Sequence, residues 1–294
     1  MKKLLLLWAL AAATLTQAAP TPADSAALYQ AYLDSMHATL HYQTGRVQLG
    51  VATLTVPNGF RFLDSAQSRR VLTQFWGNPN GESLGMLFPA GKQPLDDNSW
   101  AFVVEYEPMG YVKDDDAEDI DYDELLTDMQ TDTEEGNAER TAAGYEPVKL
   151  VGWAAAPFYD KNLNVLHWAK ELQFGGAERH TLNYNVRLLG RKGVLNLNAV
   201  GGMDQLAGVR GTIPAVIKSV SFSKGLQYAA FDPDLDEVAA YGLGGLVAGK
   251  VLAKVGAFAL LAKFWKVILA AGAAGVAGLR RLFGGGAASS DNQA

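Results

Sequence analysis

The sequence of 294 residues contains no cysteine. Without cysteine the chain cannot form a disulfide scaffold, an iron–sulfur centre, a thiolate zinc site or a thiol-dependent active site. Basic residues are also in the minority, with 25 Lys and Arg against 31 Asp and Glu. A negative net charge repels phosphate groups, so we expect no nucleic-acid partner.

Enzyme signatures are scarce as well. No glycine-rich loop is completed by the Lys and Ser or Thr that a phosphate loop needs, and no nucleophile stands next to a base in the sequence. We therefore predict no catalytic residue and no cofactor.

Residues 1–18 have the layout of a secretory signal peptide. A short basic start precedes an apolar run over residues 4–15, and small residues follow. We predict cleavage between Ala18 and Ala19, because a cut one residue later would leave a proline directly after it. The apolar run is too short for a comfortable membrane span.

A second apolar stretch lies near the other end of the chain. Residues 255–279 are long enough for one transmembrane helix, at ~1.5 Å per residue across a hydrocarbon core of ~30 Å. Arg280 and Arg281 follow it, as expected for a cytoplasmic end. Lys263 and Lys266 near the middle oppose this prediction, because charged side chains are costly inside a bilayer.

Two alternatives for this tail stay open. Residues 251–262 and 267–279 can form two short helices of a re-entrant hairpin, with the lysine pair at the surface. The tail can also lie on the membrane, although its lysines do not form a single polar stripe. Small residues four apart further allow self-association through the C-terminal helix.

These features divide the chain into five parts, and the exported part is strongly acidic. Residues 19–238 hold 17 of the basic and 30 of the acidic residues, a net charge near −13. Such a surface favours cationic or basic partners. The parts are a signal peptide (1–18), an exported domain (19–238), a glycine-rich juxtamembrane segment (239–254), a transmembrane helix (255–279) and a short cytoplasmic tail (280–294).

Alternating hydrophobicity predicts a sheet in the exported domain. Short loops join the predicted strands from residue 166 onward, so we expect an antiparallel meander. Helices on one face of this sheet would complete an α+β fold. Strands are predicted at 47–56 (a hairpin), 60–63, 100–106, 145–153, 166–174, 182–188 and 195–199, and helices at 21–40, 65–76, within 114–140 and at 206–220.

The alternation leaves polar residues on one face of the meander. Asparagine has a low strand propensity, so several asparagines on one face indicate that something specific is bound or bridged there. Alternatively, the amides hydrogen-bond to one another, to backbone or to water. The candidate binding residues are His167, Glu171, Asn183, Asn185, Arg187, Asn196 and Asn198.

An acidic run over residues 114–124 is the sharpest charge feature. Asp119, Asp121 and Asp123 have the alternate spacing of a calcium loop, which makes them candidate metal ligands. The glycine and bidentate glutamate that such a loop needs are replaced by Glu124 and Gln130. A solvated helix start, where the helix macrodipole favours acidic residues, is the favoured explanation.

Five phrases in the chain resemble a known family of predicted membrane-anchored bacterial proteins, grouped as domain of unknown function 2167. The resemblance covers residues 24–281 and implies an envelope location and an anchor, without any activity or catalytic residue. In fold, the expected sheet with its helices resembles small lumenal and periplasmic domains of the PsbP type. The phrases are GYVKDDDA (110–117), DYDELL (121–126), LVGWA (150–154), WAKEL (168–172) and LNYNVRLLGRKGVLNL (182–197).

The sequence thus predicts a single-pass bacterial inner-membrane protein with its main domain in the periplasm. That domain would bind a protein partner or an envelope component through its sheet face or its acidic helix. The alternative is a cation-dependent or hydrolytic domain that uses the acidic run with His167 or His180.

Overall fold

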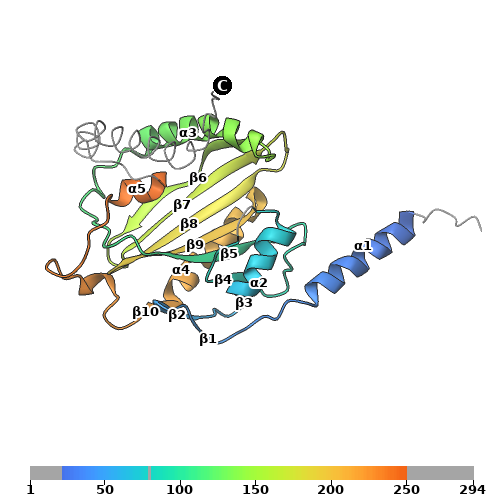
Figure 1. Ribbon diagram of the computed structural model, residues 1–294, viewed down its shortest axis with the longest axis horizontal. Helices are drawn as coiled ribbons and strands as arrows, with labels where there is room; N and C mark the ends of the chain where they lie inside the picture. The colour runs from blue at the N-terminus through green and yellow to red at the C-terminus, as the bar shows by residue number, and fades with distance from the viewer. Residues whose placement is uncertain (1–21, 79–80, 250–294) are drawn as a thin grey trace, which may run out of the picture.

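The structure is a computed structural model that describes residues 22–78 and 81–249 (Figure 1). Two antiparallel sheets form the body, one with the order β1-β2-β10 and one with the order β3-β4-β5-β9-β8-β7-β6. The strands are β1 (Arg46–Gln48), β2 (Ala52–Thr55), β3 (Phe60–Asp64), β4 (Gly85–Pro89), β5 (Ala101–Glu107), β6 (Val148–Asp160), β7 (Val165–Phe174), β8 (Thr181–Gly190), β9 (Gly193–Gly202) and β10 (Val220–Phe222). The helices are α1 (Pro22–His37), α2 (Ser65–Arg70), α3 (Tyr122–Ala142), α4 (Leu206–Lys218) and α5 (Leu243–Ala248), with short turns η1 (Val71–Phe75), η2 (Met203–Gln205) and η3 (Tyr228–Ala230).

The predicted α+β class and the antiparallel meander are confirmed. Strands β6, β7, β8 and β9 follow one another as hairpins, and β9 then pairs with β5. The predicted hairpin at residues 47–56 is the β1–β2 pair, which turns at Gly50 with a φ of 77°. Strands β4 and β10 have no counterpart among the predicted strands.

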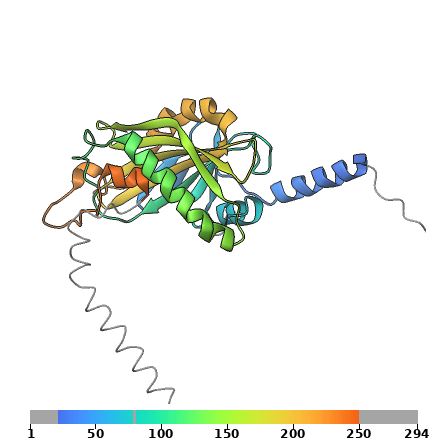
Figure 2. The ribbon, with the colours of Figure 1, turned by 90° about the horizontal axis from the view of Figure 1, so that it is seen from above.

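Helices cover both faces of the large sheet, so the prediction that they pack on one face is wrong (Figure 2). The reason is that both faces carry apolar rows. On the first face, which we call the α4 face, Tyr184 and Leu197 pack with Val209 and Ile213 of α4 and with Leu54 of the small sheet.

The opposite face, which we call the α3 face, carries two separate apolar clusters. One lies under α3 and α5 and includes Leu166 and Trp168. The other lies beside α2 and η1 and includes Met86, Phe88 and Val103. In Figure 1 the strands between α3 and α2 are seen face-on, with no helix drawn over them.

Caps fix where two helices begin. Asp64 caps α2, and its carboxylate accepts a hydrogen bond from the Gln67 amide at 3.0 Å. Asp121 caps α3 in the same way, accepting from the amides of Asp123 and Glu124 at 3.0 Å each. Most of the acidic run therefore precedes the helix.

Helix α1 projects away from the body in both views (Figures 1 and 2). Within residues 22–78 and 81–249, no helix has the length and apolar character needed to cross a membrane. The predicted signal peptide (1–18) and transmembrane helix (255–279) lie outside the described residues, so both remain predictions.

Candidate functional site

Polar side chains on the α3 face line up in rows across the strands. Antiparallel pairing sets the register, and side chains two apart along a strand share a face. Glu105 of β5, Asn196 of β9 and Arg187 of β8 form one such row. Two further rows continue toward the other end of the strands. We call the set the polar floor: Glu105, Lys170, Asn183, Asn185, Arg187, Asn196 and Asn198.

Arg187 is the centre of the polar floor. Its guanidinium donates to the side-chain oxygens of Asn198 at 2.6 Å and Asn185 at 3.3 Å. Asn198 in turn donates to the Glu105 carboxylate at 3.4 Å. The guanidinium also lies 5.1 Å from the centre of the Trp168 ring. The amides thus link a buried cation to a carboxylate that it does not touch directly.

The charges of the polar floor are partly desolvated. Burial and, to a smaller extent, the neighbouring Arg187 together lower the pKa of Lys170 to about 8. Burial also lowers the pKa of Arg187 to about 10, although Glu107 and Glu105 favour its charged form. The pKa of Glu105 is raised, chiefly by burial, against the opposing effect of Arg187. Clusters of perturbed ionisable groups of this kind are typical of functional sites.

Two buried polar atoms on this face lack a partner among the described residues. Asn196 is only 1% exposed; its amide nitrogen donates to Glu107 at 2.7 Å, but its oxygen accepts no hydrogen bond. The indole nitrogen of Trp168, also 1% exposed, donates none. Buried polar groups are nearly always paired, so each exception needs an explanation.

Three adjoining cavities open along the polar floor. The middle one, of about 340 Å³, is lined by Trp76, Glu82, Glu105 and Asn198, among others. A second cavity of about 400 Å³ shares Glu82 and Glu105 with it. A third, of about 270 Å³, shares Trp76 and Val200 with it. Because neighbouring cavities share lining residues, we treat them as one feature, the polar groove.

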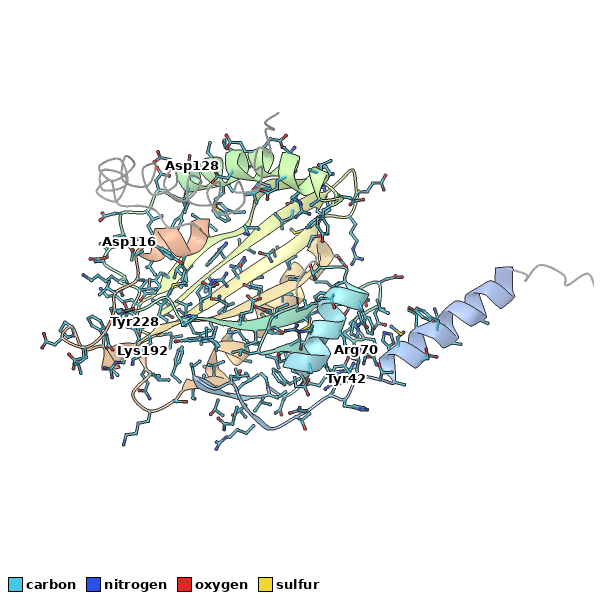
Figure 3. All side chains as sticks on the ribbon, in the orientation of Figure 1. Tyr42, Arg70, Asp116, Asp128, Lys192 and Tyr228 are labelled. Carbon is cyan, nitrogen blue, oxygen red and sulfur yellow. The ribbon has the colours of Figure 1, made fainter. Side chains whose placement is uncertain are left out.

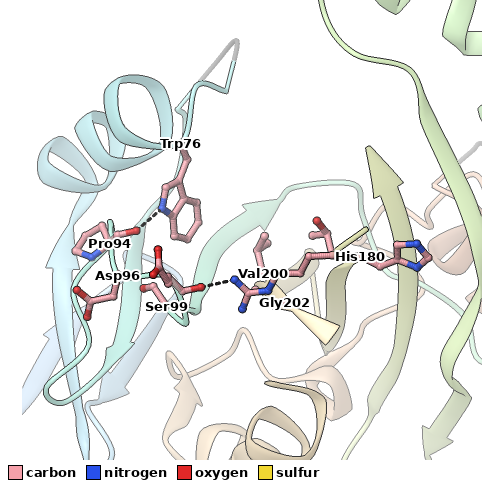
Figure 4. Close-up of a pocket in the computed structure, with 11 residues that line it drawn as sticks. Trp76, Pro94, Asp96, Ser99, His180, Val200 and Gly202 are labelled. Atoms are coloured by element: carbon pink, nitrogen blue, oxygen red, sulfur yellow. Dashed lines mark hydrogen bonds between the residues drawn. The ribbon is translucent and has the colours of Figure 1, made fainter. Parts of the chain in front are cut away.

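The third cavity brings a serine and a histidine to its lining without pairing them (Figure 4). Ser99 lies near Trp76, whose indole donates to the Pro94 carbonyl at 2.9 Å. His180 lies at the other end and its imidazole points away from the cavity. That imidazole is instead 2.5 Å from Glu171. A nucleophile and its base must be within hydrogen-bond reach, so this cavity does not present such a pair.

The prediction that His167 and Glu171 share a face with the asparagines is wrong. Both lie on the α4 face, because His167 is paired with Val186 and Glu171 with Leu182. The imidazole of His167 lies 3.2 Å from the Tyr184 hydroxyl. The other five candidates do share the α3 face.

Sequence reasoning missed two members of the polar floor for different reasons. Lys170 stood out as the one charge in an otherwise apolar row with Trp168 and Leu172, and this interruption was the signal that could have identified it. Glu105 lies on the α3 face of β5, but nothing in the sequence shows that β5 pairs with β9 and so brings Glu105 next to Asn196. Trp76 and Glu82 lie in or near connections, where no pattern indicates their position.

The acidic run lies at a different place. Asp114, Asp115, Glu118 and Asp119 line a cavity of about 550 Å³ together with Tyr159, and no histidine is part of the lining. In the part of the chain that the structure describes, no three His, Asp or Glu side chains are placed so that they could hold a metal ion. The geometry therefore gives Asp119, Asp121 and Asp123 no shared metal site, since Asp121 serves as the helix cap.

The sequence also contains one Gly-x-Ser-x-Gly pattern, GESLG at residues 81–85, which is an exception to the scarcity of enzyme signatures. In a nucleophile elbow this pattern forms a strand-to-helix turn. Here it leads into β4 instead. Ser83 lines the second cavity of the polar groove, and its hydroxyl is buried and has no hydrogen-bond partner among the described residues.

Comparison with known families agrees with the resemblance found in the sequence. The sequence model described as "Protein of unknown function (DUF2167)" matches residues 41–277. The chain belongs to this family. The match includes every residue of the polar floor and of the polar groove.

Solved structures add two similar folds. The DUF2167 chain is similar to cyanobacterial PsbP (CyanoP) from Synechocystis sp. PCC 6803, with 12% identity, a TM-score of 0.34, and coverage of 63% of this chain and 92% of that one. It is also similar to LpqN of Mycobacterium tuberculosis, described as involved in cell envelope biogenesis, with 14% identity, a TM-score of 0.32, and coverage of 65% and 96%. No curated protein matches the sequence.

Proposed function

We propose that this protein is an exported, membrane-anchored envelope protein whose α+β domain binds an extended ligand in the polar groove. The observation that carries the binding function is the polar groove itself. It adjoins buried, partly unpaired polar groups and lies between two apolar clusters that hold its walls. A cavity with a few convergent polar groups is the usual form of a ligand site.

The location is supported by the two ends of the sequence. The secretory layout of residues 1–18 would carry the domain across the inner membrane, and residues 255–279 would hold it there. The ligand would accordingly be a protein or another component of the periplasm. The strongly acidic composition of residues 19–238 disfavours an anionic ligand.

The walls of the polar groove make it suitable for a ligand longer than a single small molecule. Leu72 and Val103 are buried within the cluster beside α2, so one wall rests on core packing. The cavities follow one another and together have lining residues from η1, β5, β8 and β9. Rigid elements on several sides favour a pre-formed site.

Occupancy of the polar groove can be tested in cells, because the chain has no cysteine of its own. Asn78→Cys places a thiol in the lining of the middle cavity, and Asn162→Cys places one in the exposed β6–β7 turn. Both variants would be treated with a membrane-impermeant maleimide, in cells with a permeabilised outer membrane and after purification.

We expect Asn162→Cys to react equally in both states and Asn78→Cys to react more slowly in cells than after purification. Equal rates for Asn78→Cys would contradict a ligand in the polar groove. Failure of Asn162→Cys to react in cells, together with reaction after purification, would contradict export.

A further inference from the structure

Carboxylates outnumber basic side chains in the lining of the polar groove. Glu82, Glu105 and Glu107 line the second cavity, and Asp96 and Asp97 line the third. None of the three glutamates forms an ion pair with a described residue. Carboxylates gathered in a partly enclosed space favour a cationic ligand.

A second observation, the presence of buried acceptors without a partner, also favours a ligand that donates hydrogen bonds. Asn196 is 1% exposed, and its oxygen is an acceptor without a donor among the described residues. Its amide lies next to the second cavity, because its nitrogen donates to Glu107, which lines that cavity. Ser83 lines the same cavity, and its buried hydroxyl oxygen also has no partner among the described residues. Buried polar atoms without a partner in or beside a cavity favour a ligand that donates hydrogen bonds.

The basic groups nearby do not offset this preference. Arg187 already donates to Asn198 and Asn185. Arg179 of the third cavity is paired with Asp204 at 2.9 Å. Lys170 is a member of the polar floor but does not line any of the three cavities.

The same cavities have an apolar side. Leu72, Trp76, Val103 and Val200 line the middle cavity beside Glu82 and Glu105. Methylene groups would pack on these side chains while a charge at their end meets a carboxylate. The indole of Trp76, held by the Pro94 carbonyl, also offers a ring to a cation.

We infer that the polar groove binds alkylammonium groups, that is, primary or secondary amines at the end of short methylene chains, with Glu82 and Glu105 as their counter-ions. Two sources share this chemistry: the lysine side chains of an extended peptide segment and free polyamines. The inference rests on the proposed function and specifies the ligand of that same site.

Single metal ions fit the polar groove less well than alkylammonium groups do. In the described part of the chain no three acidic or histidine side chains converge closely enough to hold one. Carboxylates spread along adjoining cavities instead suit a ligand whose positive charges are separated.

The test is a calorimetric titration of the full-length protein in mild detergent at low ionic strength. The probes are spermidine, the peptide acetyl-Ala-Lys-Ala-Lys-Ala-amide, and the same peptide with both lysines acetylated. Variants Glu105→Gln and Glu82→Gln remove one charge each while keeping the side-chain shape. Glu135→Gln removes one charge from the exposed surface of α3 and is the matched control.

We expect spermidine or the lysine peptide to bind, and Glu105→Gln and Glu82→Gln each to weaken binding about tenfold, as for loss of a charged hydrogen bond. Glu135→Gln should bind like the unaltered chain, and the acetylated peptide should not bind. Binding of spermidine alone would assign the site to polyamines, and binding of the peptide alone would assign it to lysine side chains.

Three results would overturn the inference: no binding of either probe, equal binding of the acetylated peptide, or equal weakening by Glu135→Gln. Glu82 is exposed in a connection, so its variant keeps the test valid if Glu105→Gln disturbs folding. Protection of Asn78→Cys in cells, combined with no binding of either amine, would leave the binding function intact and reject only the ligand class.

Discussion

At the scale of single residues, the polar floor shows how one sheet face accommodates charged side chains between two apolar clusters. Arg187 is buried, yet its partners are amide oxygens rather than a carboxylate. Asn198 then joins it to Glu105. Such a network keeps a cation and an acid apart while satisfying both, at the cost of leaving some atoms, such as the Asn196 oxygen, without a partner.

Removing the centre of this network should be costly. We expect Arg187→Met to lower the free energy of unfolding by about 3 kcal/mol, because Asn198 and Asn185 would lose their donor and Glu105 would lose a nearby opposite charge. Lys192→Met, at an exposed position in the next turn, should change it by less than about 0.5 kcal/mol. Urea unfolding of both variants measures the difference, and equal stabilities would contradict the network.

Lys170 predicts a dependence of stability on pH. The pKa of Lys170 is about 8 in the folded chain, below the usual 10.5. As the pH rises, the folded chain therefore loses the Lys170 proton before the unfolded chain does. Below pH 8 the full cost of burying the charged Lys170 side chain opposes folding. Between pH 8 and pH 10.5 this cost decreases, because the folded chain has released the proton while the unfolded chain still carries it. Lys170→Met should therefore stabilise the protein on the order of 2 kcal/mol at pH 7 and progressively less above pH 8. Urea unfolding at pH 7.0 and 9.5 checks this, and a difference independent of pH would contradict it.

At the scale of elements, one carboxylate from outside the helix caps the first turn of α5. Asp116, labelled beside α5 in Figure 3, accepts hydrogen bonds from the amides of Leu243 at 3.0 Å and Gly244 at 3.1 Å. The helix is short, but Leu243 and Val247 are buried beside α3. This helix is the last described element before the predicted membrane segment.

Loss of this cap should release α5 locally. We expect Asp116→Ala to lower the free energy of unfolding by about 1 kcal/mol and to increase hydrogen exchange in residues 243–248. Asp119→Ala, at an exposed acid of the same run, should leave exchange in α5 unchanged. Equal exchange in both variants would show that packing alone holds α5.

The sequence was informative where one pattern determines the structure. Strict alternation identified β7, β8 and β9, and short loops identified their antiparallel pairing. Pairing across long connections was not accessible, so the place of β5 next to β9, and with it Glu105, came only from the structure. His167 and Glu171 are polar like the asparagines, but each lies one residue away along β7 from Trp168 or Lys170. Side chains alternate along a strand, so both lie on the α4 face. The bulged strand β6 extends to Asp160, beyond the predicted 145–153, since its three register shifts disturb the alternation.

Charge patterns were less decisive than hydrophobic ones. The acidic run predicts both a helix start and a cation loop, and the structure uses Asp121 as a cap and Asp116 to hold α5. Neither role can be read from spacing, because each depends on which backbone amides the fold brings near.

At the scale of the whole molecule, we propose that the acidic domain lies outside the cytoplasm, with its polar groove open to periplasmic ligands. The groove lies on the α3 face, and α5 packs on that same face beside α3.

Topology is the claim on which these proposals depend, and one measurement tests it directly. A reporter that is active only in the periplasm would be fused after Phe231 and, separately, after Ala288, in bacterial cells. We predict activity at Phe231 and none at Ala288, as for an exported domain held by one span. Activity at both sites would favour a hairpin or a surface-bound tail. Silence at Phe231 would contradict export and place the polar groove in the cytoplasm.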